Sequence, residues 1–265
     1  MKSEKLPASS KQQRGEQFKI QNYPNFNEEQ KLWRKGLRAV VGLDEAGRGP
    51  LAGPVIAAAI CLASAKFKVQ SSKFKMSVQN SKFLEIRDSK KLTARQRDEW
   101  YKILTVHPDI KWGIGIVSEK IIDRINIFEA TKLAMMRAIK NLRIEPEFIL
   151  LDGNFILEDL SVSQKAVIRG DEKIFSCAAA SIIAKVTRDR LMCRLSRKYP
   201  EYGFERHKGY GTKRHRESLK KHGACEIHRK SFRPVRLLPG SRILAGADSA
   251  NKNSNAKISL PGLPK

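Results

Sequence analysis

The chain has 265 residues, enough for one large domain with a full hydrophobic core. Its 52 Lys and Arg residues against 27 acids give a formal net charge of +25, which favours polyanionic partners and makes nucleic acid the first candidate. The cysteines lack zinc-type spacing, residues 1–15 lack an apolar signal segment, and no apolar run is long enough to span a bilayer. We therefore expect a soluble cytoplasmic protein without disulfides.

The N-terminal half begins with a polar stretch. Residues 1–37 are rich in Lys, Gln and Ser, which predicts a disordered basic extension with one short helix at 26–33. Two apolar runs, 39–43 and 55–62, predict buried strands. Residues 63–83 carry five lysines and no acid, and we interpret them as an inserted basic loop or hairpin. Such an insertion either contacts nucleic acid or is simply solvated.

Strands and helices then alternate along the chain. The predicted strands lie at 110–117, 148–151 and 166–168. The predicted helices lie at 93–106 with Thr93 as N-cap, at 118–142, and at 174–197. Residues 237–265 are rich in Gly, Ala, Ser, Asn and Pro, which predicts a disordered tail. The alternation indicates an α/β fold with a mixed sheet flanked by helices.

Acidic residues stand at the ends of three predicted strands. Asp44 and Glu45 follow the first strand, Asp152 follows the strand 148–151, and Asp171 follows the strand 166–168. Ligands of open α/β sheets bind outside the carboxyl ends of the strands, so we expect these four carboxylates to converge. Their repulsion requires cations, and oxygen ligands favour Mg²⁺ or Mn²⁺. Two ions about 3.5–4 Å apart would clamp both oxygens of a phosphoryl displacement.

A glycine-rich turn follows the first acidic pair. An isolated Asp-Glu pair more often caps a turn than binds a ligand. Here, however, Gly47 and Gly49 flank Arg48, so bare backbone can approach a ligand while an arginine points at it. Acids for a cation, bare backbone and an arginine together suit a phosphate-bearing substrate.

Five sequence blocks carry a family resemblance. The segment GLDEAGRGPLAGPV at 42–55 resembles the N-terminal motif of ribonuclease HII, the type 2 ribonuclease H of bacterial type. Four further blocks match in the same order: DSKKL at 88–92, LDGN at 151–154, GDEK at 170–173 running on to Lys185, and KGYGT at 208–212. One block alone would be weak, but five in order are highly specific.

The resemblance implies a fold and a reaction. It implies a ribonuclease H-like catalytic domain over residues 38–236 that includes a helical C-terminal segment. Asp44, Glu45, Asp152 and Asp171 match the metal-binding and catalytic acids of the family, and we assign Asp44 as the acid that bridges two ions. The implied activity is endonucleolytic hydrolysis of RNA in RNA–DNA hybrids, and nicking on the 5′ side of ribonucleotides embedded in duplex DNA. The products carry 5′-phosphate and 3′-hydroxyl ends, and the implied role is ribonucleotide removal in DNA replication and repair.

The resemblance also implies how the substrate is recognised. Gly47, Arg48 and Gly49 match residues that contact the 2′-hydroxyl and flanking phosphate at an RNA–DNA junction, and Tyr210 matches a tyrosine that stacks on the following deoxyribose. Lys90 is expected near the site and Lys185 is expected to bind phosphate, although both could equally be partners in structural ion pairs. Residues 194–236 hold 14 Lys and Arg against 4 acids, which indicates a nucleic-acid-facing surface. The four histidines in that range lack metal-site spacing.

Two other classes of protein remain open on the sequence. A non-catalytic basic binding module would not require four acids at strand ends. Another two-metal nuclease of the same fold, such as ribonuclease HIII, normally carries a sizeable N-terminal domain, whereas about 38 residues precede the motif here. The tail shows no motif for docking a sliding clamp. We expect a monomer.

Overall fold

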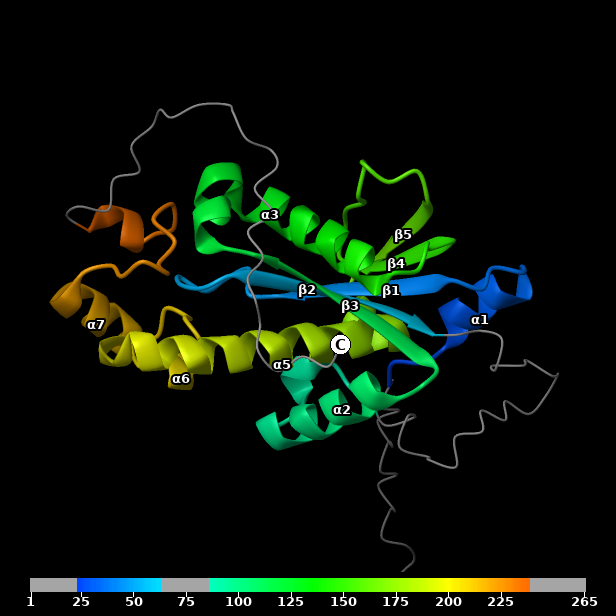
Figure 1. The fold of residues 1–265 in the computed structure, drawn as a ribbon, viewed down its shortest axis with the longest axis horizontal. Helices are drawn as coiled ribbons and strands as arrows, with labels where there is room; N and C mark the ends of the chain where they lie inside the picture. The colour runs from blue at the N-terminus through cyan, green and yellow to red at the C-terminus, as the bar shows by residue number, and fades with distance from the viewer. Residues whose placement is uncertain (1–22, 63–85, 239–265) are drawn as a thin grey trace, which may run out of the picture.

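The computed structural model describes residues 23–62 and 86–238, which form one mixed sheet covered by helices on both faces (Figure 1). The strands run in the order β3-β2-β1-β4-β5; β1, β2 and β3 are antiparallel neighbours, whereas β1, β4 and β5 are parallel. The elements are α1 (Asn27–Arg34), β1 (Val40–Ala46), β2 (Val55–Leu62), the 3-10 helix η3 (Ser89–Lys91), α2 (Ala94–Val106), β3 (Ile110–Val117), α3 (Glu119–Leu142), β4 (Phe148–Asp152), β5 (Ser163–Val167), α4 (Gly170–Lys173), α5 (Phe175–Lys198), η4 (Pro200–Tyr202), α6 (Phe204–His207), α7 (Lys213–His222) and η5 (Val235–Leu237).

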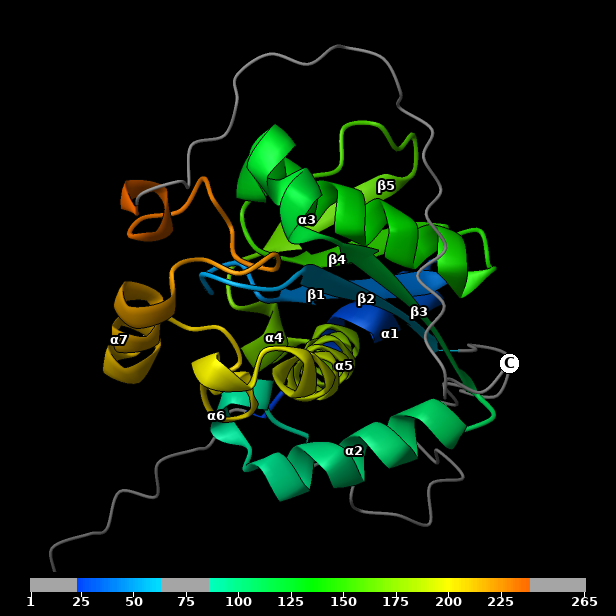
Figure 2. The same ribbon diagram turned by 60° about the vertical axis from the view of Figure 1, so that its left-hand side comes forward.

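The helices cover the two faces of the sheet unequally. Helix α3 lies on one face, and α5 lies on the other with α2 beside it (Figure 2). Successive side chains of β2 alternate between these layers because strand residues point to opposite faces: Ile56 and Ile60 pack with α5, while Val55 and Ala59 pack with α3. A strand buried on both faces has no polar position, which explains the unbroken apolar run of β2. The predicted α/β class is therefore confirmed.

Most predicted elements are present with shifted ends. Thr93 caps α2 as predicted, in a capping box with Gln96. The helix predicted at 118–142 is interrupted at Asn126, whose φ of 67° breaks α3. The strand predicted at 166–168 lies at Ser163–Val167 instead, so Ile168 falls beyond it and is 67% exposed. This strand lies at the edge of the sheet, where alternate residues face solvent and are polar. A search for apolar runs therefore does not detect it.

The N-terminal segment corrects one prediction. Residues 23–37 are folded on the core, where the helix predicted at 26–33 is present as α1, so the predicted disorder does not reach these residues. Phe26 stacks on Phe175 with ring centroids 4.2 Å apart, and the buried Glu29 accepts a hydrogen bond of 2.8 Å from the backbone N–H of Ser176. Burial raises the pKa of Glu29 to about 7. The remainder of the extension, the basic insertion 63–83 and the tail from residue 239 lie outside the described residues.

The C-terminal segment is more than a basic surface. It contributes a small hydrophobic core of its own, in which Tyr202, Phe204, Leu219 and Ile227 pack against Leu51 and Met192 among others. The loop after β1 is therefore anchored in residues about 150 positions or more further along the chain. Within residues 23–62 and 86–238, no helix has the length and apolar character that a membrane span needs.

Candidate active site

Three of the predicted acids meet at one edge of the sheet. Parallel strands β1 and β4 pair with Leu43 opposite Leu151, so the next residues, Asp44 and Asp152, lie side by side. Asp171 comes from the short helix α4 rather than from the end of a strand, which corrects its predicted position. One carboxylate oxygen of each of these residues lies within 4.8 Å of the others. The predicted convergence is confirmed for these three acids, which we call the acidic trio.

Backbone and lysine contacts hold the trio in place. The N–H of Gly170 donates to Asp152 Oδ1 at 2.7 Å, and the N–H of Glu45 donates to Asp44 Oδ1 at 2.7 Å. Lys90 Nζ donates to Asp171 Oδ2 at 3.1 Å, so Lys90 lies beside the trio and forms an ion pair there, and its contact with substrate stays a prediction. Asp88 accepts from the N–H of Lys90 at 2.9 Å. This hydrogen bond places the lysine against Asp171.

The electrostatics of the trio favour a bound cation. Burial raises the pKa of Asp44 well above its ordinary value, and the charges of Glu45 and Asp152 raise it further. Burial also raises the pKa of Asp152, with Asp171 as the next cause. Carboxylates gathered in this way repel one another, and a divalent cation between them would remove the repulsion. The donors are all hard carboxylate oxygens, which fit Mg²⁺ or Mn²⁺ better than a soft metal.

Glu45 stands apart from the trio. It follows Asp44 on β1, and successive strand residues point to opposite faces. Its Oε1 lies 3.4 Å from Nη1 of Arg48. Burial raises the pKa of Glu45, and the charge of Arg48 opposes that rise. The charge of Asp152 also raises the pKa of Glu45 and that of Lys90 lowers it, so the fourth predicted acid borders the trio and is linked to the glycine-rich turn.

Tyr210 stands over the glycine-rich turn. A Cβ atom built on Gly49 would lie 3.8 Å from Tyr210 Cε1, and the Tyr210 side chain is 44% exposed. Leu51 N–H donates to the carbonyl of Gly209 at 2.8 Å, which ties the two loops together. Lys185 Nζ lies 5.9 Å from the centre of the Tyr210 ring and 2.8 Å from Asp189 Oδ1. The structure thus brings together residues 47–49, Tyr210 and Lys185, which are far apart in sequence.

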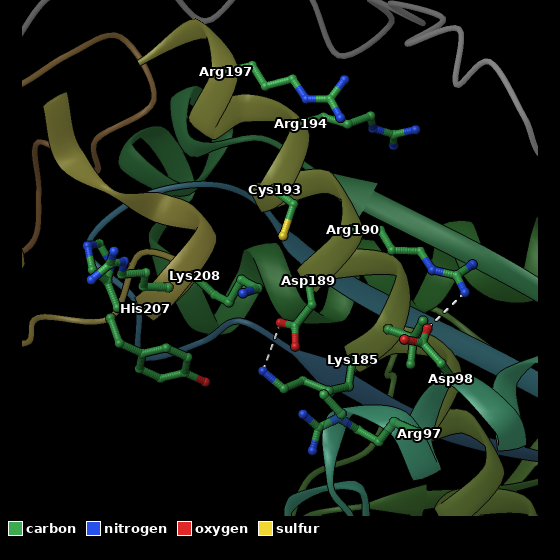
Figure 3. A pocket seen from close by; sticks show the side chains of 14 residues that line it. Arg97, Asp98, Lys185, Asp189, Arg190, Cys193, Arg194, Arg197, His207 and Lys208 are labelled. Carbon is green, nitrogen blue, oxygen red and sulfur yellow. Dashed lines mark hydrogen bonds and ion pairs between the residues drawn. The ribbon is translucent and has the colours of Figure 1, made fainter. Parts of the chain in front are cut away.

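A basic cavity extends from Tyr210 and Lys185 along α5 (Figure 3). Its volume is about 700 Å³, and its lining includes seven Lys or Arg residues against two Asp residues. Both aspartates are paired, Asp98 with Arg190 at 2.9 Å and Asp189 with Lys185. The side chains of Arg194 and Arg197 follow along the same helix (Figure 3). This excess of positive charge suits a phosphate backbone.

Two buried arginines were not recognised in the sequence. Arg188 donates to the carbonyls of Ala52, Pro54 and Lys208 at 3.0–3.1 Å. Arg229 donates to the carbonyls of Gly47, Arg48 and Gly53. Both side chains are almost fully buried, so they organise the site loops rather than face a ligand. In so basic a chain, composition gave no signal that separates them from surface arginines.

Comparison with known proteins gives one family. A family model described as Ribonuclease HII matches residues 41–235, a range that includes the trio, the glycine-rich turn and Tyr210. The chain is 47% identical over 213 residues to Ribonuclease HII of Caldicellulosiruptor bescii, covering 80% of this chain and 94% of that relative. It is 48% identical over 203 residues to Ribonuclease HII of Chlamydia muridarum, covering 77% and 86%.

Solved structures agree with the sequence relatives. The structure of ribonuclease H2 from Pyrococcus horikoshii matches with a TM-score of 0.58 at 28% identity, covering 75% of this chain and 95% of that chain. The ribonuclease HII in a PCNA:RNase HII complex from Archaeoglobus fulgidus matches with a TM-score of 0.57 at 28% identity, covering 73% and 95%. The chain therefore belongs to the ribonuclease HII family, whose members are endoribonucleases that act on the RNA of RNA–DNA hybrids.

Proposed function

We propose that the acidic trio, with Glu45, forms a two-metal site for Mg²⁺ or Mn²⁺, and that the enzyme also nicks duplex DNA on the 5′ side of an embedded ribonucleotide. The supporting observation is the position of the trio beside a turn of bare backbone with Tyr210 above it. The products would carry 5′-phosphate and 3′-hydroxyl ends. Residues 38–236 form the catalytic unit in this proposal, which acts as a monomer in the cytoplasm and serves ribonucleotide removal in replication and repair.

The residues of the trio have distinct parts in the proposed reaction. Asp44 lies on β1, the central strand of the sheet, and would hold the cations together with Asp152 and Asp171, with Asp44 assigned as the shared ligand. Bound divalent cations would supply charge neutralisation at the phosphate and a lowered pKa for the attacking water. Lys90 holds Asp171 in place and adds positive charge beside the scissile phosphate. Glu45 supports the site and orients Arg48 through their contact.

Recognition of the junction is assigned to the two adjoining loops. A protein tells RNA from DNA by sensing the 2′-hydroxyl, and the bare backbone at residues 47–49 allows a ribose to approach closely. Arg48 is assigned to the flanking phosphate. Tyr210, which lies near Gly49, is assigned to stack on the deoxyribose that follows. Lys185, beside Tyr210, is assigned to the next phosphate.

The decisive test uses a DNA duplex with one embedded ribonucleotide, incubated with Mn²⁺, Mg²⁺ or EDTA. We expect a single nick on the 5′ side of the ribonucleotide with either cation and no cleavage in EDTA. Cleavage of long hybrids alone would overturn the junction assignment and leave the metal chemistry standing. Tight, salt-sensitive binding without any cleavage would instead indicate a binding protein.

The basic cavity gives a second prediction, on salt dependence. Each Lys or Arg that neutralises a DNA phosphate contributes about −0.9 to the slope of log affinity against log salt. Arg194→Gln combined with Arg197→Gln should therefore make this slope shallower by about 1.8 and weaken binding at low salt. The check is fluorescence anisotropy with a labelled hybrid at several salt concentrations in EDTA. Lys140→Gln, on α3 across the sheet, is the matched control, and an equal effect there would disprove a role for the cavity.

One relative was solved with a partner protein, PCNA, bound to it. This relative is the Archaeoglobus fulgidus protein, and the complex is a property of that protein. The sequence prediction that this chain has no clamp-docking motif concerns its tail, most of which lies outside the described residues. It stays a prediction.

A further inference from the structure

Residues 225–232, which we call the clamp segment, connect the two loops of the site. One loop is residues 47–54, after β1, and the other is residues 208–212, which carry Tyr210. Arg229 lies in this segment and reaches one of them. Its Nη2 donates to the carbonyl of Gly47 at 2.6 Å, its Nη1 to that of Arg48 at 2.8 Å, and its Nε to that of Gly53 at 2.9 Å. A guanidinium carries five donors in a rigid plane, and here three of its N–H groups are used on one loop. Because these carbonyls accept hydrogen bonds from a buried guanidinium, the backbone of the Gly-Arg-Gly turn is fixed on its buried side.

His228, the preceding residue, reaches the other loop. The Tyr210 carbonyl can only accept, so Nδ1 of His215, 2.9 Å away, carries a proton and donates to it. His215 Nε2 is then an acceptor, and it lies 3.0 Å from His228 Nε2, which must donate. His228 Nδ1 in turn accepts from the N–H of Cys225 at 3.0 Å. A single set of neutral tautomers satisfies every bond, and it ends on the main chain of Tyr210.

Both histidines are held in the neutral state that this chain of bonds needs. They are fully buried, and His228 lies against the rings of Tyr202 and Phe204 with centroids 4.8 and 5.6 Å away. Burial lowers the pKa of His215 to about 4 and that of His228 to about 3. A proton on the second nitrogen of His215 would face the donor of His228, which also disfavours the charged form.

The clamp segment is itself fixed to the main body of the protein. Asp123 on α3 accepts from the N–H groups of Lys230 and Ser231 at 2.8 and 2.9 Å and from the Ser231 hydroxyl at 2.6 Å. The N–H of Arg229 donates to the carbonyl of Leu51, and the N–H of Gly53 donates to that of Ile227, both at 2.8 Å. A segment anchored in this way can hold two loops at a fixed separation.

We propose that His228 and Arg229 are positioning residues that set the spacing between the Gly-Arg-Gly turn and Tyr210, and thereby the enzyme's preference for an RNA–DNA junction. The inference rests on the proposed function, in which the turn reads the 2′-hydroxyl and Tyr210 reads the deoxyribose after it. The two residues then have separable effects. Arg229 acts on every substrate because each carries a 2′-hydroxyl, whereas His228 acts only where a deoxyribose follows the ribose.

The experiment compares four variants of the full chain: two at His228, a control at Tyr202, and Arg229→Lys. His228→Phe keeps a ring against Tyr202 and Phe204 but loses the donor to His215 and the acceptor for the N–H of Cys225. His228→Gln can still donate and accept, and should restore the wild-type behaviour. The matched control is Tyr202→Phe, which keeps the ring and removes only a hydrogen bond of 2.9 Å from the hydroxyl to the carbonyl of Gly223, a residue outside both site loops.

The first readout is kcat and KM on a duplex with one embedded ribonucleotide and on a hybrid with an all-RNA strand. His228→Phe should lower kcat/KM roughly tenfold on the embedded ribonucleotide, mainly through KM, and leave the long hybrid within about twofold; a supporting residue of a site typically costs 10–100-fold. Tyr202→Phe should leave the ratio of the two substrates unchanged. If His228→Phe changes both substrates equally, or no more than Tyr202→Phe does, the proposal is wrong.

The second readout is hydrogen–deuterium exchange, which does not depend on activity. His228→Phe should speed exchange in residues 208–212 and leave residues 47–49 unchanged, and Arg229→Lys should speed exchange in residues 47–49 and leave residues 210–212 unchanged. Failure of either local change would overturn the anchoring. If the wild type does not nick the embedded ribonucleotide at all, the proposed junction function fails, and the exchange pattern still decides whether the clamp segment holds the two loops.

Discussion

Asp44→Asn is expected to lower cleavage of RNA–DNA hybrids by more than about 100-fold, the upper range for loss of a residue that merely supports a metal ligand. The same substitution should raise the Tm of the metal-free protein. The buried carboxylate is destabilised by burial and by the charges of Glu45 and Asp152, and a neutral amide removes that repulsion. The amide oxygen of asparagine can still accept from the N–H of Glu45, so the local fold is kept.

The measurement pairs steady-state cleavage with thermal unfolding in EDTA and in Mn²⁺. The wild type should gain stability on adding Mn²⁺, because a ligand that binds only the native state stabilises it. Asp44→Asn should gain much less. Asp159→Asn is the matched control: this aspartate is exposed in the loop after β4, and neither activity nor Tm should change. A variant that keeps full activity, or a wild type whose Tm is indifferent to the cation, would contradict the proposed metal site.

Gly47→Ala is expected to be the most destabilising single change in the glycine-rich turn. Gly47 has a φ of +100°, and a Cβ there would lie 2.1 Å from Arg188 Nε and 2.8 Å from the carbonyl oxygen of Pro54. Relief requires moving a buried guanidinium that is bonded to three carbonyls. Strain and overpacking together should cost about 3 kcal/mol, which lowers Tm by roughly 6–12 °C for a domain of this size.

Gly49→Ala, two residues further on, is the control for that prediction. Gly49 has no positive φ, and its nearest neighbour would be Tyr210 Cε1 at 3.8 Å, an ordinary contact. The cost in stability should stay below about 1 kcal/mol. The added methyl group would still stand where the ribose is proposed to approach, so KM should rise while Tm holds. Equal losses of Tm in the two variants would show that neither the positive φ of Gly47 nor its close approach to Arg188 excludes a side chain there.

The sequence alone predicted that Asp44, Asp152 and Asp171 come together. The acids lie at or near the ends of apolar strands, and strand neighbours in a parallel pair share an edge, so convergence of Asp44 and Asp152 follows from local pattern. Asp171 illustrates the limit of that logic. Asp171 belongs to the same trio but lies on α4 and not at a strand end. The polar edge strand β5 ends four residues before it.

The sequence did not predict which basic residues lie inside. Local pattern depends on the chain within a turn or two, whereas the burial of Arg188 and Arg229 depends on carbonyls as much as 182 residues away. The same reason hid the packing of α1 through Glu29 and the histidine bonds that lead from His228 to Tyr210. The sequence by itself determined the acids, the bare turn, the family and the α/β layers, since each is written in short stretches. Only the tertiary structure decided how the turn and Tyr210 are held together, because buried donors are paired by the fold and not by their neighbours in the chain.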